Sequence, residues 1–167
     1  RAVPDRGPAV SVRLRPARPT DAGTLGEMMT EAVSDRPWKP RLHSGAEDIA
    51  HAGEMIERGW VTVAESRDGG SLLGFLAREG AYVHALFIAP EAQGCGIGRQ
   101  LVSAAQAESP RLELWTFEAN GRAQRFYERA GFAIVARGDG TSNAEGLPDI
   151  HYRWEAPVAP AQKEARR

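Results

Sequence analysis

Residues 89–99, with the sequence APEAQGCGIGR, constrain the fold of this chain more than any other segment. They form a glycine-rich turn that follows the apolar, strand-like run Val83–Ile88. After the turn, apolar residues recur at helical spacing, at Ile97, Leu101 and Val102. Glycine lets a backbone approach a ligand without Cβ clashes, and the first turn of a helix presents unpaired N–H groups and a positive dipole end. The segment therefore predicts a site for a ligand that carries phosphate.

Two common phosphate motifs do not fit this turn. A dinucleotide fingerprint needs a third glycine where Arg99 stands, and a P-loop needs a Gly-Lys pair that is missing here. Gln93, Gly96 and Gly98 instead occupy the defining places of a Q/R-x-x-G-x-G/A pattern. This pattern resembles the pyrophosphate loop of the GNAT superfamily of acyl-CoA N-acyltransferases. For the loop taken alone, an ordinary turn before a helix remains the alternative.

A second segment strengthens the resemblance. Residues 120–132, NGRAQRFYERAGF, are similar to the family's N-x-x-A-x-x-F-Y-x-x-x-G-F segment and follow at the spacing expected for one more strand, Leu112–Phe117. The chain is identified as a member of the GNAT superfamily from about Val12 to Glu155. The resemblance implies an α/β fold with a mixed sheet, helices on both faces and the element order β-α-α-β-β-β-α-β-α-β-β. We expect a single N-acetyltransferase domain over residues 12–155, with flexible segments at 1–11 and 156–167.

Composition narrows the classes of function. A chain of 167 residues suits one domain, and its formal net charge of -1 argues against a nucleic-acid partner, which calls for a basic surface. No apolar run approaches the roughly 20 residues that span a membrane, and no secretory signal is evident, so we expect a cytoplasmic protein. The single cysteine fits a reducing compartment, and the four histidines lack metal-ligand spacing, so no metal is expected.

The resemblance implies acetyl-CoA as the acyl donor. It assigns the pyrophosphate to a loop made of Gln93, Gly94, Cys95, Gly96, Ile97, Gly98 and Arg99. It also assigns the pantetheine arm to the main chain of Phe87 and Ile88, on a central strand that splays away from its neighbour, and a cofactor contact to Asn120. By residue type alone, Asn120 is a helix N-cap and Arg99 a solvated helix arginine. Cys95 stands at a variable position of the loop, where we expect no catalytic role.

Tyr127 has two interpretations. With Ala123, Phe126 and Ala130 it forms a stripe at helical spacing, which by pattern alone predicts a core position. The resemblance implies a sharper role, in which Tyr127 protonates the departing thiolate. A phenol with a pKa of about 10 can donate to a thiolate whose thiol has a pKa of about 8.5.

The general base is open between two side chains and water. Strand alternation places Tyr82, His84, Leu86 and Ile88 on one face of the central strand, and histidine titrates near neutrality. Glu118, just past the end of the next strand, is the other candidate. Some members of the family use a carboxylate roughly where Tyr82 stands, and its absence here leaves a water relay as a third route.

The sequence therefore predicts an N-acetyltransferase that moves the acetyl group of acetyl-CoA to a primary amine by direct attack in a ternary complex. The small size and near-neutral charge favour a small-molecule amine. The alternatives are a protein N-acetyltransferase, another acyl group such as succinyl, and a non-catalytic acyl-CoA-binding sensor. Many members of the family are dimers, so a homodimer also stays open, although no apolar stripe in the sequence requires one.

Overall fold

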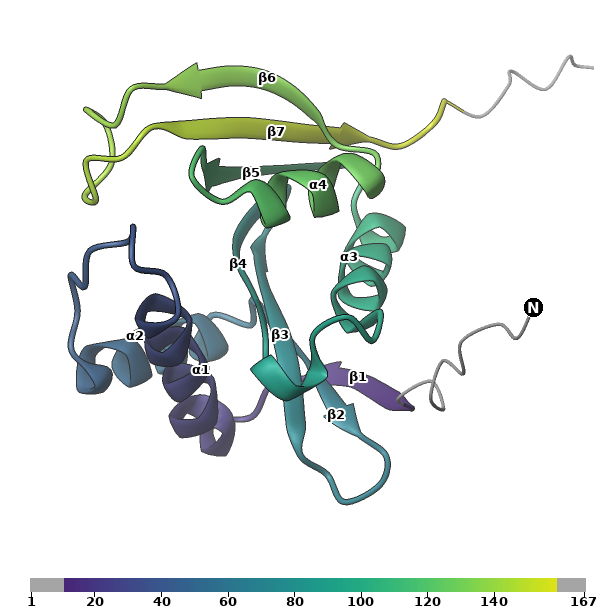
Figure 1. The fold of residues 1–167 in the computed structure, drawn as a ribbon. Coiled ribbons are helices and arrows are strands. Elements are labelled where there is room, and N and C mark those ends of the chain that lie inside the picture. Colours follow the sequence, from purple (N-terminus) through teal and green to yellow (C-terminus); the bar gives the residue numbers. More distant parts are fainter. Residues whose placement is uncertain (1–10, 159–167) are drawn as a thin grey trace, which may run out of the picture.

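The computed structural model describes residues 11–158, which form one seven-stranded mixed sheet with four α-helices (Figure 1). The strand order is β1-β2-β3-β4-β5-β7-β6. The strands are β1 Val12–Pro16, β2 Val61–Ser66, β3 Leu72–Glu79, β4 Tyr82–Ile88, β5 Arg111–Phe117, β6 Ala133–Gly138 and β7 Asp149–Glu155. The helices are α1 Ala22–Ser34, α2 Gly45–Glu57, α3 Ile97–Glu108 and α4 Gly121–Arg129, with short 3-10 turns at Pro19–Asp21 and Pro90–Ala92. This order confirms the predicted α/β fold.

The expected terminal segments mostly lie beyond this part of the chain. Residues 1–10 and 159–167, which make up nearly all of the predicted flexible segments 1–11 and 156–167, are outside the described residues. Within residues 11–158, no helix combines the length and apolar character needed to cross a membrane. The same residues hold no group of three or more His, Cys, Asp or Glu side chains arranged to bind a metal ion.

The sheet is open between its two central strands. Every neighbouring pair is antiparallel except β4 and β5, which are parallel and share the single register pair Tyr82–Glu113. The backbone N–H of Glu113 donates to the carbonyl of Ala81 at 2.8 Å, and no further pair joins the two strands. The strands therefore diverge toward their carboxyl ends, which confirms the predicted splay and leaves the far half of β4 without a partner on this side.

Helices cover both faces of the sheet, as expected. The helices α1 and α2 pack together on one face, and α3 and α4 lie on the other (Figure 1). The fully buried core draws Leu25 and Met55 from the first pair, Leu101 from α3, and Phe75 and Tyr152 from the sheet. Because the helices bury their apolar stripes against a sheet that is split at β4 and β5, their ends meet around the split.

Local sequence signals fix most helix ends. Ser44 and Glu47 form a reciprocal capping box at the start of α2, with both hydrogen bonds at 3.1 Å. Gly131 has a φ of +94° just after α4, as predicted for a helix end. By residue type, Thr20-Asp21 predicts an N-cap for the first helix, and this prediction needs a correction. Asp21 precedes α1, but its carboxylate accepts hydrogen bonds from Arg15 and from the backbone of Arg18 instead of capping α1.

Candidate functional site

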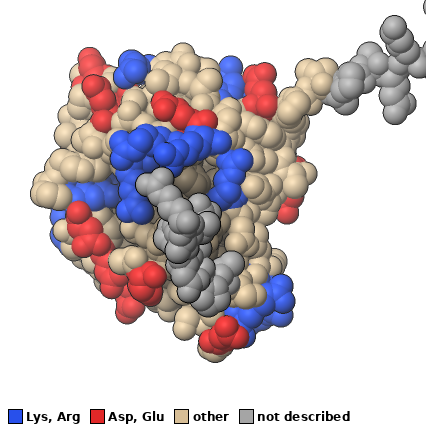
Figure 2. All heavy atoms as spheres, turned by 45° about the vertical axis from the view of Figure 1, so that its right-hand side comes forward, with Lys and Arg blue, Asp and Glu red and all other residues tan. Residues whose placement is uncertain are grey.

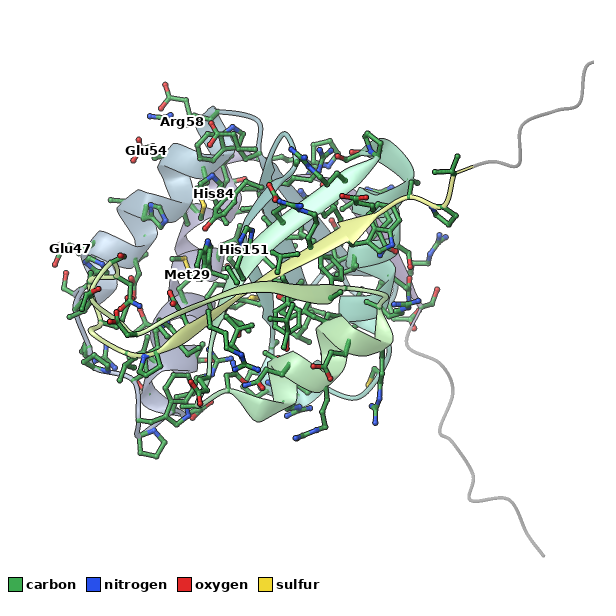
Figure 3. The ribbon with its side chains drawn as sticks, turned by 90° about the horizontal axis from the view of Figure 1, so that it is seen from above. Met29, Glu47, Glu54, Arg58, His84 and His151 are labelled. Carbon is green, nitrogen blue, oxygen red and sulfur yellow. The ribbon has the colours of Figure 1, made fainter. Side chains whose placement is uncertain are left out.

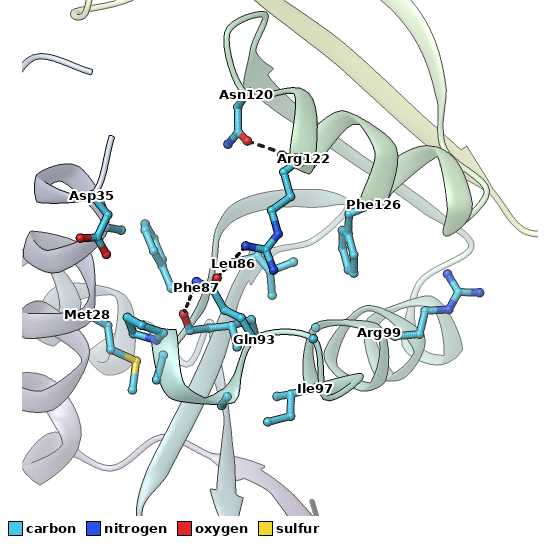
Figure 4. A pocket seen from close by; sticks show the side chains of 18 of the residues that line it. Met28, Asp35, Leu86, Phe87, Gln93, Ile97, Arg99, Asn120, Arg122 and Phe126 are labelled. Carbon is cyan, nitrogen blue, oxygen red and sulfur yellow. Dashed lines mark hydrogen bonds between the residues drawn. The ribbon is translucent and has the colours of Figure 1, made fainter. Parts of the chain in front are cut away.

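A cavity of about 650 Å³ lies where the split sheet meets the helix ends. Its walls are the carboxyl half of β4, the glycine-rich loop with the start of α3, one face of α4 and the end of α1, which stands opposite α3 and α4 (Figure 4). Ten of the residues singled out in the sequence line it: Phe87, Ile88, Gln93, Gly94, Gly96, Ile97, Gly98, Arg99, Asn120 and Tyr127. Segments far apart in the sequence thus converge on one cavity.

The loop presents a row of backbone donors to this cavity. Within residues 11–158, no carbonyl or side chain accepts a hydrogen bond from the N–H groups of residues 94–99. Gly94 and Gly96 hold φ values of +78° and +81°, which an L-residue adopts only with strain. Together with the N-terminus of α3, these donors form a site for an anion.

Gly98 is needed for a different reason. A Cβ at this position would lie 3.3 Å from the ring of Phe126 and 3.7 Å from the side chain of Ile88. Its φ is not positive, so the requirement is close packing of α3 against α4 and β4. Gly98, the third defining place of the loop pattern, therefore serves packing, whereas Gly94 and Gly96 serve the turn.

Gln93 ties the loop to its surroundings. Arg122 of α4 donates from Nη1 to the Gln93 side-chain oxygen at 2.7 Å, and the Gln93 amide points at the carbonyl of Ile88 at 3.5 Å (Figure 4). The first contact is a charge-assisted hydrogen bond, and the second is at the limit of one. Gln93 thus holds the loop, α4 and the end of β4 in a fixed relation.

Exposed arginines line the α3 and α4 side of the cavity. Arg99 belongs to α3, while Arg122, Arg125 and Arg129 belong to α4. Basic side chains gather around a hollow on the face shown in Figure 2. This local charge contrasts with the formal net charge of -1 for the whole chain. Sequence reasoning singled out Arg99 and missed the three on α4, although their i, i+3, i+7 spacing placed them on one face.

Asn120 caps α4, as its residue type predicted. Its side-chain oxygen accepts a hydrogen bond from the backbone N–H of Ala123 at 3.1 Å. The residue also lines the cavity beside Arg122. The cap is therefore confirmed, and the contact to a bound cofactor stays a prediction.

Tyr127 belongs to both the core and the cavity. Its ring packs against Phe126, Phe132 and Tyr152, with centroids 5.2, 5.5 and 6.1 Å away. Burial raises the pKa of the phenol, while the nearby charge of Arg36 opposes that rise. Within the described chain the hydroxyl forms no hydrogen bond. Because no fully buried side-chain oxygen there lacks a partner, this hydroxyl keeps some accessible surface, and Tyr127 lines the cavity. The stripe therefore predicted the burial correctly, and the phenol stays protonated at neutral pH.

His84 does not line the cavity, because β4 carries a bulge at this residue. In the pairing of β3 with β4, Ala77 faces Ala85 and Arg78 faces Val83, so His84 is an extra residue. The bulge reverses the alternation of side chains along β4. The prediction that Tyr82, His84, Leu86 and Ile88 share one face is therefore wrong.

The contacts of these residues confirm the reversal. Ile88 lies against Gly98 on the α3 side. His84 stacks on Trp60 at 4.7 Å, bonds to Glu79 at 3.0 Å and contacts Tyr82, on the side that α1 and α2 cover (Figure 3).

The remaining candidates also lie outside the cavity lining. Glu118 is exposed, and its backbone N–H donates to the carbonyl of Pro148 at 2.9 Å. Cys95 is an exposed free cysteine at the tip of the loop. Neither residue, nor His84, is among those that line the cavity. The choice of general base among His84, Glu118 and water thus stays a prediction.

Comparison with known proteins decides the family. The family model described as acetyltransferase (GNAT) domain matches residues 53–134, which contain the glycine-rich loop, α3 and α4. The chain belongs to the GNAT superfamily. It is 40% identical over 80 residues to the peptidyl-lysine N-acetyltransferase YjaB of Escherichia coli (strain K12), which covers 48% of this chain and 52% of that protein. The chain thus spans about half the length of this curated GNAT relative.

Solved structures share the GNAT fold over nearly the whole chain. The solution structure of apo YjaB from Escherichia coli superposes with a TM-score of 0.70 at 23% identity, covering 88% of this chain and 99% of that one. The structure of yncA from Salmonella typhimurium with its cofactor acetyl-CoA gives a TM-score of 0.67 at 20% identity, covering 92% and 99%. At these identities the two structures support the fold alone.

Proposed function

We propose that this chain is an N-acetyltransferase that moves the acetyl group of acetyl-CoA to a primary amine of a small molecule. The observation that carries the proposal is the row of unpartnered N–H groups at residues 94–99, in the same cavity as Tyr127 and beside the diverging strands. An anion site, an unpaired strand edge and a protonated phenol are the three features that acyl transfer from a thioester of coenzyme A needs.

The cavity fits the successive parts of coenzyme A. The N–H groups of residues 94–99 would hold the pyrophosphate, with the exposed arginines of α3 and α4 beside the phosphates. The main chain of Phe87 and Ile88 would pair with the amides of the pantetheine arm, because β5 has already diverged from β4 at that point. This arrangement leads the thioester toward Tyr127.

The residues then suffice for direct transfer. The acceptor ammonium loses a proton to water, His84 or Glu118, and its nitrogen attacks the thioester carbonyl carbon. As the C–N bond forms and the C–S bond breaks, the nitrogen releases its second proton to water, and Tyr127 donates its own proton to the departing sulfur. Tyr127 later regains a proton from solvent. The products are an amide and the coenzyme A thiol. The main contribution of the site is proximity and orientation, so no covalent enzyme intermediate is required.

A protein lysine is the second candidate acceptor. The curated relative that matches about half of this chain is named a peptidyl-lysine N-acetyltransferase. The matched segment is therefore equally consistent with either acceptor. A non-catalytic acyl-CoA sensor would need the same loop but no proton donor at Tyr127.

The test is release of coenzyme A thiol from acetyl-CoA in the presence of small primary amines, amino acids and lysine-containing peptides, run beside calorimetric titration of CoA. We expect binding together with thiol release that depends on a small amine. Release with peptides alone would replace the small-molecule acceptor by a protein. Binding without release on any acceptor would favour the sensor, and no binding at all would overturn the proposal.

A further inference from the structure

Arg36 differs from the other arginines of the cavity. It follows α1, which forms the wall opposite α3 and α4, and it is half-buried where Arg99, Arg122, Arg125 and Arg129 are exposed. Within residues 11–158, its guanidinium has no hydrogen-bond or salt-bridge partner. Glu31 and Asp35 line the same wall, but both are exposed and neither forms a salt bridge with Arg36 within these residues. The charge of Asp35 only partly opposes the effect of burial on the pKa of Arg36.

A half-buried cation without a partner is unfavourable in the ligand-free chain. Burial lowers the pKa of Arg36, and the positive charge of Arg122 acts in the same direction. Lys39, three residues later, is half-buried too, and burial and the charge of Arg36 lower its pKa. Lys39 lies outside the cavity lining, with its Nζ 5.5 Å from the ring centroid of Phe117, so it is Arg36 that meets the cavity. Desolvated charges are stable when they are paired, so the half-buried Arg36 guanidinium is complementary to an anion in the cavity.

The position of Arg36 separates this anion from the phosphates of coenzyme A. Arg36 and Tyr127 line the same cavity, and the charge of Arg36 acts on the Tyr127 phenol. The phosphate donors belong instead to the loop at residues 94–99 and to the exposed arginines. In the proposed function, Tyr127 marks the reacting end of the donor. Arg36 therefore faces the groups that surround the thioester.

We propose that Arg36 binds a carboxylate beside the thioester, carried by the acceptor amine or by the acyl chain. This inference rests on the proposed function and specifies its substrate class. A planar guanidinium binds a carboxylate through two parallel hydrogen bonds, which an ammonium or an amide does not reproduce. An amino acid or a dicarboxylic acyl group supplies that carboxylate. A lysine residue within a protein has no carboxylate of its own, because its α-carboxyl group forms a peptide bond.

The experiment compares matched ligands that differ by the carboxylate. L-Alanine is paired with ethylamine and L-phenylalanine with 2-phenylethylamine, using acetyl-CoA as donor. Succinyl-CoA is paired with propionyl-CoA, which lacks only the carboxylate, using ethylamine as acceptor. The first arm tests a carboxylate on the acceptor, and the second tests one on the acyl chain. We expect one arm to show a preference for the carboxylate of about tenfold to a hundredfold in kcat/KM.

Variants of Arg36 test whether this residue causes the preference for a carboxylate. Arg36→Gln should abolish it while leaving the affinity for CoA unchanged, and Arg36→Lys should retain only part of it. The matched control is Arg41→Gln, in the same segment after α1. Arg41 is exposed, lies outside the cavity lining and bonds to Ser34 at 2.6 Å. This control should keep the full preference.

Three results would overturn the inference. The first is an Arg36→Gln variant that keeps the preference, and the second is a wild type that has none in either arm. The third is a loss of CoA affinity in Arg36→Gln equal to its loss of activity, which would make Arg36 a phosphate ligand. Calorimetric titration of each amine into the CoA complex, and of succinyl-CoA against propionyl-CoA, gives the same comparison without turnover. A failure of the proposed acetyl transfer is therefore distinguishable from a failure of carboxylate binding.

Discussion

Tyr127→Phe separates the two roles of this residue, because it removes one hydroxyl and leaves the ring. The ring packs against Phe126, Phe132 and Tyr152, and phenylalanine preserves these contacts. The hydroxyl has no hydrogen-bond partner in the described chain, so the free energy of unfolding should change by less than about 0.5 kcal/mol. Loss of a general acid lowers kcat by about 10²–10⁴-fold, which is about 2.7–5.4 kcal/mol of transition-state stabilisation.

The assay measures kcat by thiol release, CoA affinity by calorimetry and stability by urea unfolding. Because burial raises the pKa of Tyr127, the phenol stays protonated through neutral and mildly alkaline pH, and the loss in kcat should be the same from pH 6 to 9. Tyr152→Phe is the matched control. Its hydroxyl donates to Glu128 at 3.1 Å, away from the cavity lining, so this variant should lose about 1 kcal/mol of stability and keep its kcat.

The reasoning is refuted if Tyr127→Phe keeps its kcat, since a positioned proton donor would then be unnecessary. An equal fall in CoA affinity, stability and kcat would also contradict it, because a packing role alone would explain that pattern.

Three further predictions concern the loop, a helix cap and a buried ion pair. Gly96→Glu should abolish CoA binding in a calorimetric titration. Gly59→Glu is the control, since it places the same charge at a similar positive φ away from the cavity, and it should bind CoA normally. Equal behaviour of the two variants would refute the loop assignment. Asn120→Ala should lower stability by about 1 kcal/mol in urea unfolding through loss of the α4 cap, and unchanged CoA affinity would remove the predicted cofactor contact. Hydrogen bonds from Arg15 hold the pKa of Asp21 below its unfolded value of about 3.9, so this stabilisation is present above about pH 4 and is lost as pH falls through the folded pKa. Arg15→Gln should therefore lose about 1–3 kcal/mol at pH 7 and less at pH 3, and an equal loss at both would contradict the pairing.

The element order and the loop were predictable because their signals are local. The glycines at 94 and 96, the apolar spacing in α3 and the capping residue Asn120 act within a few positions of themselves. The structure confirms each of these. The core position of Tyr127 was also predictable from the sequence, because it follows from helical periodicity alone.

The errors concern features that depend on partners distant in the sequence. The bulge at His84 arises from the pairing of β4 with β3, and a one-residue shift moves each later side chain to the other face. The Asp21 side chain does not cap α1 as predicted, because Arg15, on β1, binds its carboxylate. Arg36 carried no sequence signal at all, since its importance comes from the wall of a cavity that only the folded chain forms.

The central claim is that the backbone N–H groups of the glycine-rich loop bind the pyrophosphate of coenzyme A. Titration of the ¹⁵N-labelled protein with CoA, followed by amide NMR, tests it residue by residue. The account predicts that the amides of residues 94–99 show the largest shifts, with smaller ones along the end of β4. Saturable binding that leaves these amides unmoved would contradict it.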